Sequence, residues 1–315
     1  MNTQGQESGN NCDTAQNSEL RAQGEGELLN KEGSALIITL LLISILVGLV
    51  VDFVYDVYID SSSLSNWSNA QKASLIARSG QNLSTQYLAL AKESSYTYVR
   101  EIEMPVPGDF GRGAFLSIKI EDENSKFNIN SIIYPNGMTD EKALLSLKKL
   151  LKYLNINPNL SLAIADWIDP DKEPRLSDSE YLAKNTFLWS VDELKLIEGM
   201  DENIFVKISP YITVYGNHQV NINTAGLPVL VCLSPDMTEV LAKQIIEYRE
   251  TTPFEKSSSI VNVPGFEAIG IKILNRITVK GSNFRVTAKA TVDEITRVIE
   301  SVMDTSMKIR FWREG

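Results

Sequence analysis

The chain has few of the residues on which most catalytic and metal sites depend. It contains two cysteines, Cys12 and Cys232, and one histidine, His218, among 315 residues. A cysteine-based zinc site is therefore excluded, and a Ser-His-Asp triad would have to use His218, which lies in a Tyr-Gly-Asn-His-Gln turn. The sequence also lacks a phosphate-binding glycine loop and a dinucleotide fingerprint. We therefore expect a protein that is not an enzyme.

Positive charge is also scarce. Lysine and arginine number 30 against 40 aspartates and glutamates, which gives a net charge of −10. A general nucleic-acid binder carries the opposite balance, so no nucleic acid is expected as a partner. Cys232 follows an apolar run and is expected to be a buried structural thiol.

An uncharged apolar run is the most informative feature of the chain. Residues 34–51 carry no charge, and their length approaches the ~20 residues that span a bilayer. Gly33 and Ser34 precede this core, whereas an ordinary signal peptidase cleaves after it. A charged leader that ends in glycine before such a helix is typical of type IV pilins and pseudopilins, in which Gly33 and Ser34 would form the processing site. The alternative is a plain single-pass anchor in which Gly33 has no role.

The flanks of this run predict a long helix behind a polar leader. Residues 1–33 are rich in Gly, Asn, Gln, Ser and Glu, and this composition predicts disorder. Residues 34–51 form the transmembrane part of a helix whose amphipathic continuation ends near residue 91. Gly80 interrupts the pattern, so a kink is possible there.

The remaining chain alternates between β and helical character. Residues 114–121 alternate like a strand, and residues 126–130 are expected to be its hairpin partner. Residues 138–277 are mainly helical, and residues 283–312 are expected to form a three-stranded meander. We therefore place the first part of a small domain at residues 52–130, an inserted helical domain at residues 131–277, and the last strands at residues 278–315.

An internal near-repeat lies in the helical part. A segment from Phe187 to Ile212-Thr213-Val214 matches a later one from Phe254 to Ile277-Thr278-Val279, with Gly199 and Gly265 at equivalent places. Each unit is predicted to be a helix, a glycine hairpin and a second helix. A second echo is Phe127-Asn128-Ile129-Asn130-Ser131 against Val220-Asn221-Ile222-Asn223-Thr224.

Helix-hairpin-helix units often bind nucleic-acid backbones, which gives the main alternative. Asn221-Ile222-Asn223-Thr224-Ala225 resembles the DNA receptors of natural competence, so the chain could be a membrane-anchored DNA-binding protein. Local charge opposes this, because the six bases between residues 221 and 280 are balanced by six acids. A structural or protein-contact role is the stronger hypothesis.

Taken in order, several motifs resemble the K-type minor pseudopilins of type II secretion, the general secretion pathway protein K family. They run from Gly33-Ser34-Ala35-Leu36-Ile37 through Asp166-Trp167-Ile168-Asp169-Pro170-Asp171 to Trp312-Arg313-Glu314. The resemblance implies an α+β pseudopilin fold, in which a long N-terminal helix packs on a small antiparallel sheet that carries a large inserted helical domain.

The resemblance also implies a place in the cell. The protein would be a single-pass inner-membrane protein with its bulk in the periplasm, cleaved and methylated by prepilin peptidase. It would stand at the tip of the pseudopilus and initiate or cap its assembly. Its implied partners are the I- and J-type minor pseudopilins, the major pseudopilin and the inner-membrane assembly platform. Ile38, fifth from Ser34, stands where most pseudopilins carry glutamate, as expected of a subunit with no neighbour above it.

Calcium is the one cofactor that the resemblance suggests. Five acids cluster in one stretch, and hard carboxylate oxygens at short spacing suit Ca²⁺: Asp166, Asp169, Asp171, Asp178 and Glu180. The alternative is a solvated acidic loop in which Asp166 caps a turn.

Overall fold

A computed structural model describes residues 10–97, 100–106, 110, 113–177, 179 and 182–315. The chain divides into two compact units, residues 1–68 and residues 69–315. From residue 10 onward the first unit is helical, and the second unit contains the sheet and the other helices of the described residues.

Helix α1 (Asn10–Glu93) contains the apolar run and confirms the predicted long helix. Its stretch of mean hydropathy 2.9 is long and apolar enough to cross a membrane, and none of that stretch is buried by other parts of the protein. Asn10, the first described residue, already lies in α1, so the described residues 10–33 are drawn as helix, and the cleavable, disordered leader stays a prediction. Extending an existing helix avoids the cost of nucleation, so a polar segment of weak propensity can join it.

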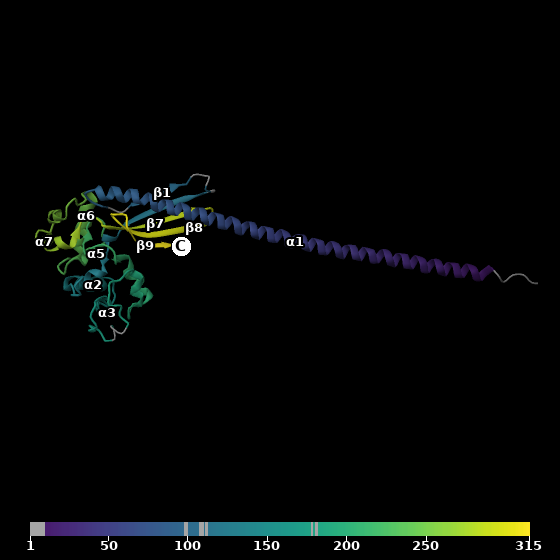
Figure 1. Ribbon diagram of the computed structural model, residues 1–315, viewed down its shortest axis with the longest axis horizontal. Helices are drawn as coiled ribbons and strands as arrows, with labels where there is room; N and C mark the ends of the chain where they lie inside the picture. Colours follow the sequence, from purple (N-terminus) through teal and green to yellow (C-terminus); the bar gives the residue numbers. More distant parts are fainter. Residues whose placement is uncertain (1–9, 98–99, 107–109, 111–112, 178, 180–181) are drawn as a thin grey trace, which may run out of the picture. The chain divides into compact units, whose positions relative to one another are not determined.

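In the second unit, the last part of α1 lies along one face of the sheet. Ala73, Ala77 and Leu88 are fully buried there. Gln81 donates to two strand carbonyls, Val286 O at 3.1 Å and Ile299 O at 2.9 Å, so the helix is also fixed by polar contacts. Figure 1 shows β7, β8 and β9 beneath this part of α1, with the other helices gathered at one end of the sheet.

Five antiparallel strands form the sheet in the order β1-β2-β7-β8-β9. Their bounds are β1 (Arg100–Pro105), β2 (Phe115–Asp122), β7 (Asn283–Val292), β8 (Ile295–Asp304) and β9 (Ile309–Glu314). The C-terminal meander is thereby confirmed, as is the strand near residues 114–121. Leu116, Ile118 and Ile120 alternate inward on β2, as the sequence pattern required.

The predicted hairpin partner of β2 is wrong. Residues 127–128 form β3 (Phe127–Asn128), which pairs in parallel with β4 (Ile212–Thr213). The neighbours of β2 are instead β1 and β7, and the last β2–β7 pair joins Asp122 to Phe284. The helical block therefore lies between two adjacent strands, where a simple hairpin would have a turn, and it is wider than the predicted residues 131–277.

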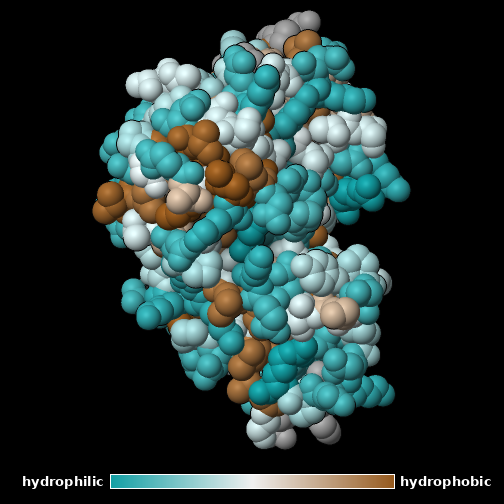
Figure 2. Space-filling model, turned by 90° about the vertical axis from the view of Figure 1, so that its left-hand side faces the viewer, coloured by the Kyte–Doolittle hydropathy of each residue, from teal (hydrophilic) through white to brown (hydrophobic). Residues whose placement is uncertain are grey.

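The helical block has its own hydrophobic core, which shares no residue with the core of the sheet in the described residues. Its α-helices are α2 (Glu141–Tyr153), α3 (Leu160–Ile168), α4 (Glu202–Ile208), α5 (Leu227–Val231), α6 (Glu239–Thr251) and α7 (Ile269–Ile273). Short 3₁₀ helices connect them: η2 (Glu123–Ser125), η3 (Ile129–Ile132), η4 (Val191–Leu196), η5 (Ser209–Tyr211), η6 (Ser257–Asn262) and η7 (Leu274–Arg276). Figure 2 shows apolar side chains gathered on the end of the molecule where Figure 1 places α6 and α7, which carry the exposed Val240 and Ile271.

The internal repeat is visible as two equivalent folding units. In the first, β3 pairs in parallel with β4; in the second, β5 (Val220–Asn221) pairs in parallel with β6 (Ile277–Thr278). Gly199 and Gly265 occupy the left-handed region with φ of +83° and +82° at the turn before the second helix. The first helix of each predicted hairpin is a 3₁₀ helix, η4 or η6, so a helix-hairpin-helix of two α-helices is not established.

Two asparagines hold these units in the same way. Asn130 donates to the carbonyls of Leu188 (2.9 Å) and Val214 (3.3 Å) and accepts from the N–H of Leu188. Asn223 donates to the carbonyls of Phe254 (2.9 Å) and Val279 (3.4 Å) and accepts from the N–H of Phe254. The last asparagine of each Asn-Ile-Asn motif, which we call a clamp asparagine, therefore makes equivalent hydrogen bonds within its own copy of a duplicated fold.

Candidate functional site

The proposed processing site lies on α1 in the first unit. A Cβ atom placed on Gly33 would meet no other atom within 4 Å, and Ser34 is exposed. Ile38 is also exposed, in line with the apolar side chains around it. A carboxylate at this position would need a partner in a membrane, and isoleucine removes that need.

The acidic loop is organised by an arginine that the sequence prediction did not include. Asp166 lies in the last turn of α3 and Asp169 directly follows the helix, and both carboxylates are fully buried. The guanidinium of Arg175 donates to Asp166 Oδ1 at 2.7 Å and also contacts Asp169. Asp166 Oδ2 accepts in addition from the N–H of Arg175 at 2.8 Å and from the hydroxyl of Ser179. Asp166 is thus fully engaged by donors of its own loop.

One oxygen of this pair has no partner among the residues that the structure describes. Asp169 Oδ1 is buried and accepts no hydrogen bond in the described part of the chain. Burial raises the pKa of Asp169 above its usual value, although Arg175 acts in the opposite direction. Asp171 is exposed, and Asp178 and Glu180 lie outside the described residues. Across the described ranges, no three His, Cys, Asp or Glu side chains converge in the way that a metal site requires.

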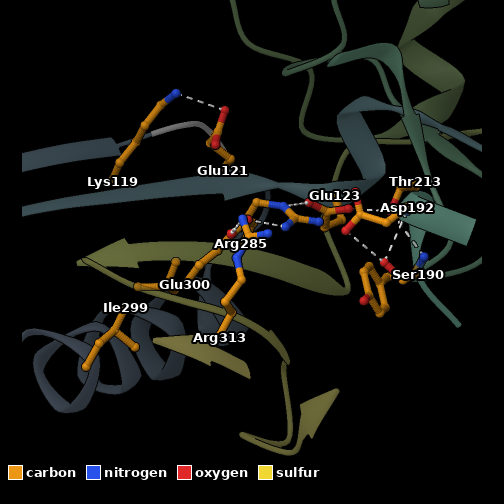
Figure 3. Close-up of polar contacts among 12 residues, drawn as sticks. Lys119, Glu121, Glu123, Ser190, Asp192, Thr213, Arg285, Ile299, Glu300 and Arg313 are labelled. Carbon is orange, nitrogen blue, oxygen red and sulfur yellow. Dashed lines mark hydrogen bonds and ion pairs between the residues drawn. The ribbon is translucent and has the colours of Figure 1, made fainter. Parts of the chain in front are cut away.

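A second polar cluster joins the sheet to the helical block. Figure 3 shows Arg285 of β7 lying between Glu123 and Glu300. Its Nε donates to Glu123 at 2.7 Å, and Glu300 also accepts from Arg313 of β9 at 2.5 Å. Burial alone would raise the pKa of Glu123, but the charges of Lys126 and Arg285 outweigh it and lower that pKa. Glu123 also accepts from the hydroxyl of Thr213, so the network ties the sheet to β4 of the block.

Asp122, next to Glu123, has the opposite environment. Its carboxylate is buried and accepts from neutral donors: the N–H of Asn124 at 2.8 Å, the amide of Asn221 at 2.6 Å and the hydroxyl of Thr224 at 3.0 Å. Desolvation outweighs these bonds and raises the pKa of Asp122. The sequence analysis missed both carboxylates. The available signal was a run of three acids, Glu121-Asp122-Glu123, that directly follows the apolar alternation of β2.

Comparisons with known proteins agree with each other. Two family models described as type II secretion system protein K match residues 125–217 and 220–280. The type II secretion system protein K of Klebsiella pneumoniae is 29% identical over 173 residues, which cover 47% of this chain and 52% of that protein. The protein of the same name from Aeromonas hydrophila is 24% identical over 313 residues, which cover 86% of this chain and 92% of that protein.

The extent of these matches differs between relatives. The chain matches about half the length of the Klebsiella protein, and 61% of the Pseudomonas aeruginosa protein of the same name. A crystal structure of the GspK-GspI-GspJ complex from the type 2 secretion system of enterotoxigenic Escherichia coli contains a similar fold. Its TM-score is 0.66 at 19% identity, over 81% of this chain and 99% of the other. The DNA-binding alternative finds no support in these matches.

Proposed function

The chain belongs to the type II secretion system protein K family, and from this premise we propose that it is a minor pseudopilin with a structural role. It would stand at the tip of the pseudopilus and initiate or cap its assembly during protein export. The observation that carries the proposal is the fold, in which one long helix with an exposed apolar run continues into a helix packed on a five-stranded sheet. Such a helix can hold a subunit in the inner membrane before assembly, with the second unit in the periplasm.

The partners follow from the same premise. The similar crystal structure is a complex of GspK with GspI and GspJ, and we propose that this chain binds the I- and J-type minor pseudopilins of its own system. Contacts with the major pseudopilin and the assembly platform are part of the same proposal. Ile38 supports a tip position, because a subunit with no neighbour above it has no amine for a carboxylate to meet.

Processing by prepilin peptidase provides the test. The intact mass of the membrane-extracted protein is measured from cells with and without the peptidase, and for the Gly33→Leu variant. We expect a chain that starts at Ser34, with an added methyl group, only when both the peptidase and Gly33 are present. Ala35→Leu is the control, since it changes the same segment but keeps the glycine. A chain cut elsewhere, or not at all, would leave residues 34–51 as a simple anchor and overturn the proposal.

Co-purification separates the partner proposal from the processing proposal. The full-length protein is extracted together with its I- and J-type partners and passed over a size-exclusion column. We expect the three to elute together. Correct processing without this complex would retain the pseudopilin assignment and contradict the tip complex.

We further propose that the acidic loop binds Ca²⁺ through Asp169, with Asp171, Asp178 and Glu180 as the other candidate ligands. Asp169 Oδ1 supports this, because it is buried, accepts no hydrogen bond from the described residues, and a buried carboxylate oxygen needs a donor or a cation. Asp166 has no free position, so its role would be to hold the loop. Since Arg175 contacts Asp169, the cation would compete with that contact.

The calcium proposal is tested by thermal unfolding of the full-length protein in Ca²⁺ and in a chelator. A cation that binds only the folded state raises Tm. We expect this rise to be lost in Asp169→Asn and kept in Glu198→Gln, an exposed carboxylate outside the loop. An equal Tm with and without Ca²⁺ would contradict the calcium proposal and show a loop held by its own donors, Arg175 and Ser179.

A further inference from the structure

A cavity lies in the first of the two repeated folding units. It has a volume of about 650 Å³, and its walls come from the Asn128–Ser131 motif, the start of α2, and the turn after β4. Tyr134 and Phe187 stand on its wall and are 48% and 37% exposed. A cavity of this size, with partly exposed aromatic side chains, is of the kind that takes up a ligand.

The second of the two repeated folding units, which contains β5 and β6, shows what binds to the equivalent surface there. There, the chain segment of residues 96–97 is docked against β6 and the turn that follows it. The N–H of Thr97 donates to Val279 O at 3.1 Å. The hydroxyl oxygen of Thr97 accepts from the N–H of Gly281 at 2.8 Å and from the amide of Asn221 at 2.9 Å. An uncharged peptide segment therefore occupies this surface in the second repeated folding unit.

The counterparts of these docking residues in the first repeated folding unit all line the cavity. Val214 corresponds to Val279, Gly216 to Gly281 and Asn128 to Asn221, and each belongs to the cavity wall. One difference matters, because the Asn128 amide donates to the carbonyls of Tyr215, Gly216 and Asn217 at 3.0–3.4 Å. An incoming segment would consequently depend on the Val214 carbonyl and the aromatic wall more than on Asn128.

The charges of the wall indicate the chemistry of the occupant. Two acids, Asp140 and Glu141, are balanced by two bases, Lys142 and Arg276. Asp140 caps α2 and Arg276 donates to Ser146 at 2.9 Å, so these groups already have partners. A wall with equal numbers of acids and bases gives no advantage to a charged ligand, whereas Tyr134 and Phe187 favour an aromatic side chain.

We propose that this cavity is a docking site for an extended, uncharged peptide segment of another polypeptide, with a serine or threonine beside an aromatic residue. The segment would bind as residues 96–97 bind in the second repeated folding unit. A backbone N–H of the segment would donate to the Val214 carbonyl, and an aromatic ring would pack against Tyr134 and Phe187. The duplicated fold thus contains two docking sites, of which one is filled by the chain itself.

The test uses the chain's own segment as a probe. Full-length protein in detergent is titrated into the fluorescein-labelled peptide Ser-Ser-Tyr-Thr-Tyr-Val, the sequence of residues 94–99, and anisotropy is measured. Asn275→Trp and His218→Trp place a large ring at exposed positions of the wall, and Tyr134→Ala removes an aromatic group from it. Val206→Trp is the matched control, because Val206 is 60% exposed on α4 and lies outside the wall.

We expect saturable binding, weakened about tenfold or more by each wall variant and unchanged within about twofold by Val206→Trp. A peptide with valine in place of threonine should also bind less tightly, because it offers no acceptor to the Gly216 turn. No saturable binding, or equal binding by Asn275→Trp and Val206→Trp, would overturn the proposal. Displacement of the labelled peptide by a short glycan but not by unlabelled peptide would also overturn it.

Discussion

At the scale of single residues, Asp122 and Glu123 show how neighbours in sequence acquire opposite ionisation behaviour. Both carboxylates are buried at the end of β2, where the sheet meets the helical block. Glu123 faces two cations, which lower its pKa, whereas Asp122 faces only neutral donors and its pKa is raised. Ionised Glu123 therefore stabilises the joint, and ionisation of Asp122 works against it.

The Glu123→Gln substitution should destabilise the protein by about 3 kcal/mol at neutral pH, because it breaks a buried ion pair and leaves Arg285 with less compensation. Since the pKa of Glu123 is lowered, its contribution is present above the unfolded value of about 4.3 and disappears as pH falls through the folded value. Urea unfolding at pH values from 7 to 3 measures this. The free energies of unfolding of the variant and the native protein should become more similar as the pH falls into the acid range.

Glu121→Gln is the matched control for this experiment. Glu121 pairs with Lys119 at 3.1 Å on the surface, where both side chains are partly exposed. Such a pair contributes about 0–1 kcal/mol. Two results would show that the buried ion pair does not cause the destabilisation. One is that Glu121→Gln lowers the free energy of unfolding as much as Glu123→Gln does, and the other is that the effect of Glu123→Gln does not change with pH.

The two clamp asparagines give a second prediction for single residues. Asn130→Ala and Asn223→Ala each remove the partner of one backbone N–H and two carbonyls, and each unsatisfied buried group costs about 1–3 kcal/mol. We expect losses of about 3 kcal/mol for both, similar to each other because the bonds are equivalent. The control is Asn275→Ala: Asn275 is exposed, so this substitution should change the free energy of unfolding by less than about 0.5 kcal/mol. Strongly unequal losses would contradict the equivalence of the two units.

At the scale of elements, Gly80 fixes how closely α1 approaches the sheet. A Cβ atom at this position would lie 2.9 Å from Leu116 Cδ1 and 3.2 Å from Ala288 Cβ, and both neighbours are buried. The sequence suggested a kink at Gly80, but these distances give the glycine a packing role. Its helix-propensity cost of about 1 kcal/mol is offset by the close contact that it permits.

Gly80→Ala should therefore destabilise the protein by about 1 kcal/mol, although alanine is the better helix former, and Gly80→Leu by about 3 kcal/mol. Chemical denaturation of the detergent-solubilised protein measures both losses. Ser79→Ala, one residue away on the exposed side of α1, should have little effect. A more stable Gly80→Ala variant would show that Leu116 yields and that the approach is not constrained.

The elements that the sequence predicted are those whose pattern is local. The apolar run, the amphipathic half of α1 and each strand of the C-terminal meander show a periodicity between residues that are close in sequence. The partner of β2 could not be predicted in this way, because β7 lies beyond the helical block and no local pattern records such a pairing. Strand β1 was also missed, since Arg100, Glu101 and Glu103 give it a polar composition that resembles a loop.

The candidate sites divide in a similar way. Spacing placed Asp166 and Asp169 together, and the structure confirms their proximity through the shared Arg175. Nothing in the spacing showed that Arg175 would be their counter-ion, because its position depends on how the loop folds back. The docking cavity was not visible either, since it is formed where Val214 and Asn128, 86 residues apart, meet across the β3–β4 pair.

At the scale of the whole molecule, the two separate hydrophobic cores indicate that the helical block is an insertion into a finished small domain. Asp122 and Phe284 are paired across β2 and β7, so their Cα atoms are about 4.5–5.5 Å apart. An Asn-Gly turn can close this gap in place of residues 123–283. We expect the shortened protein to fold, with α1 and the five strands intact, as circular dichroism and cooperative unfolding would show.

The shortened protein tests what the block does. A tip subunit that is wider than the filament would block the addition of further subunits above it, so removal of the block should give longer pseudopili. Filament length is measured by electron microscopy of cells that carry the shortened chain, with Glu121→Gln in the complete chain as the control. Removal takes away the Glu123–Arg285 pair, but Arg285 keeps Glu300 as its partner in the sheet. Normal filament length with a folded, processed and membrane-inserted short chain would contradict the capping role and leave initiation as the function of the tip.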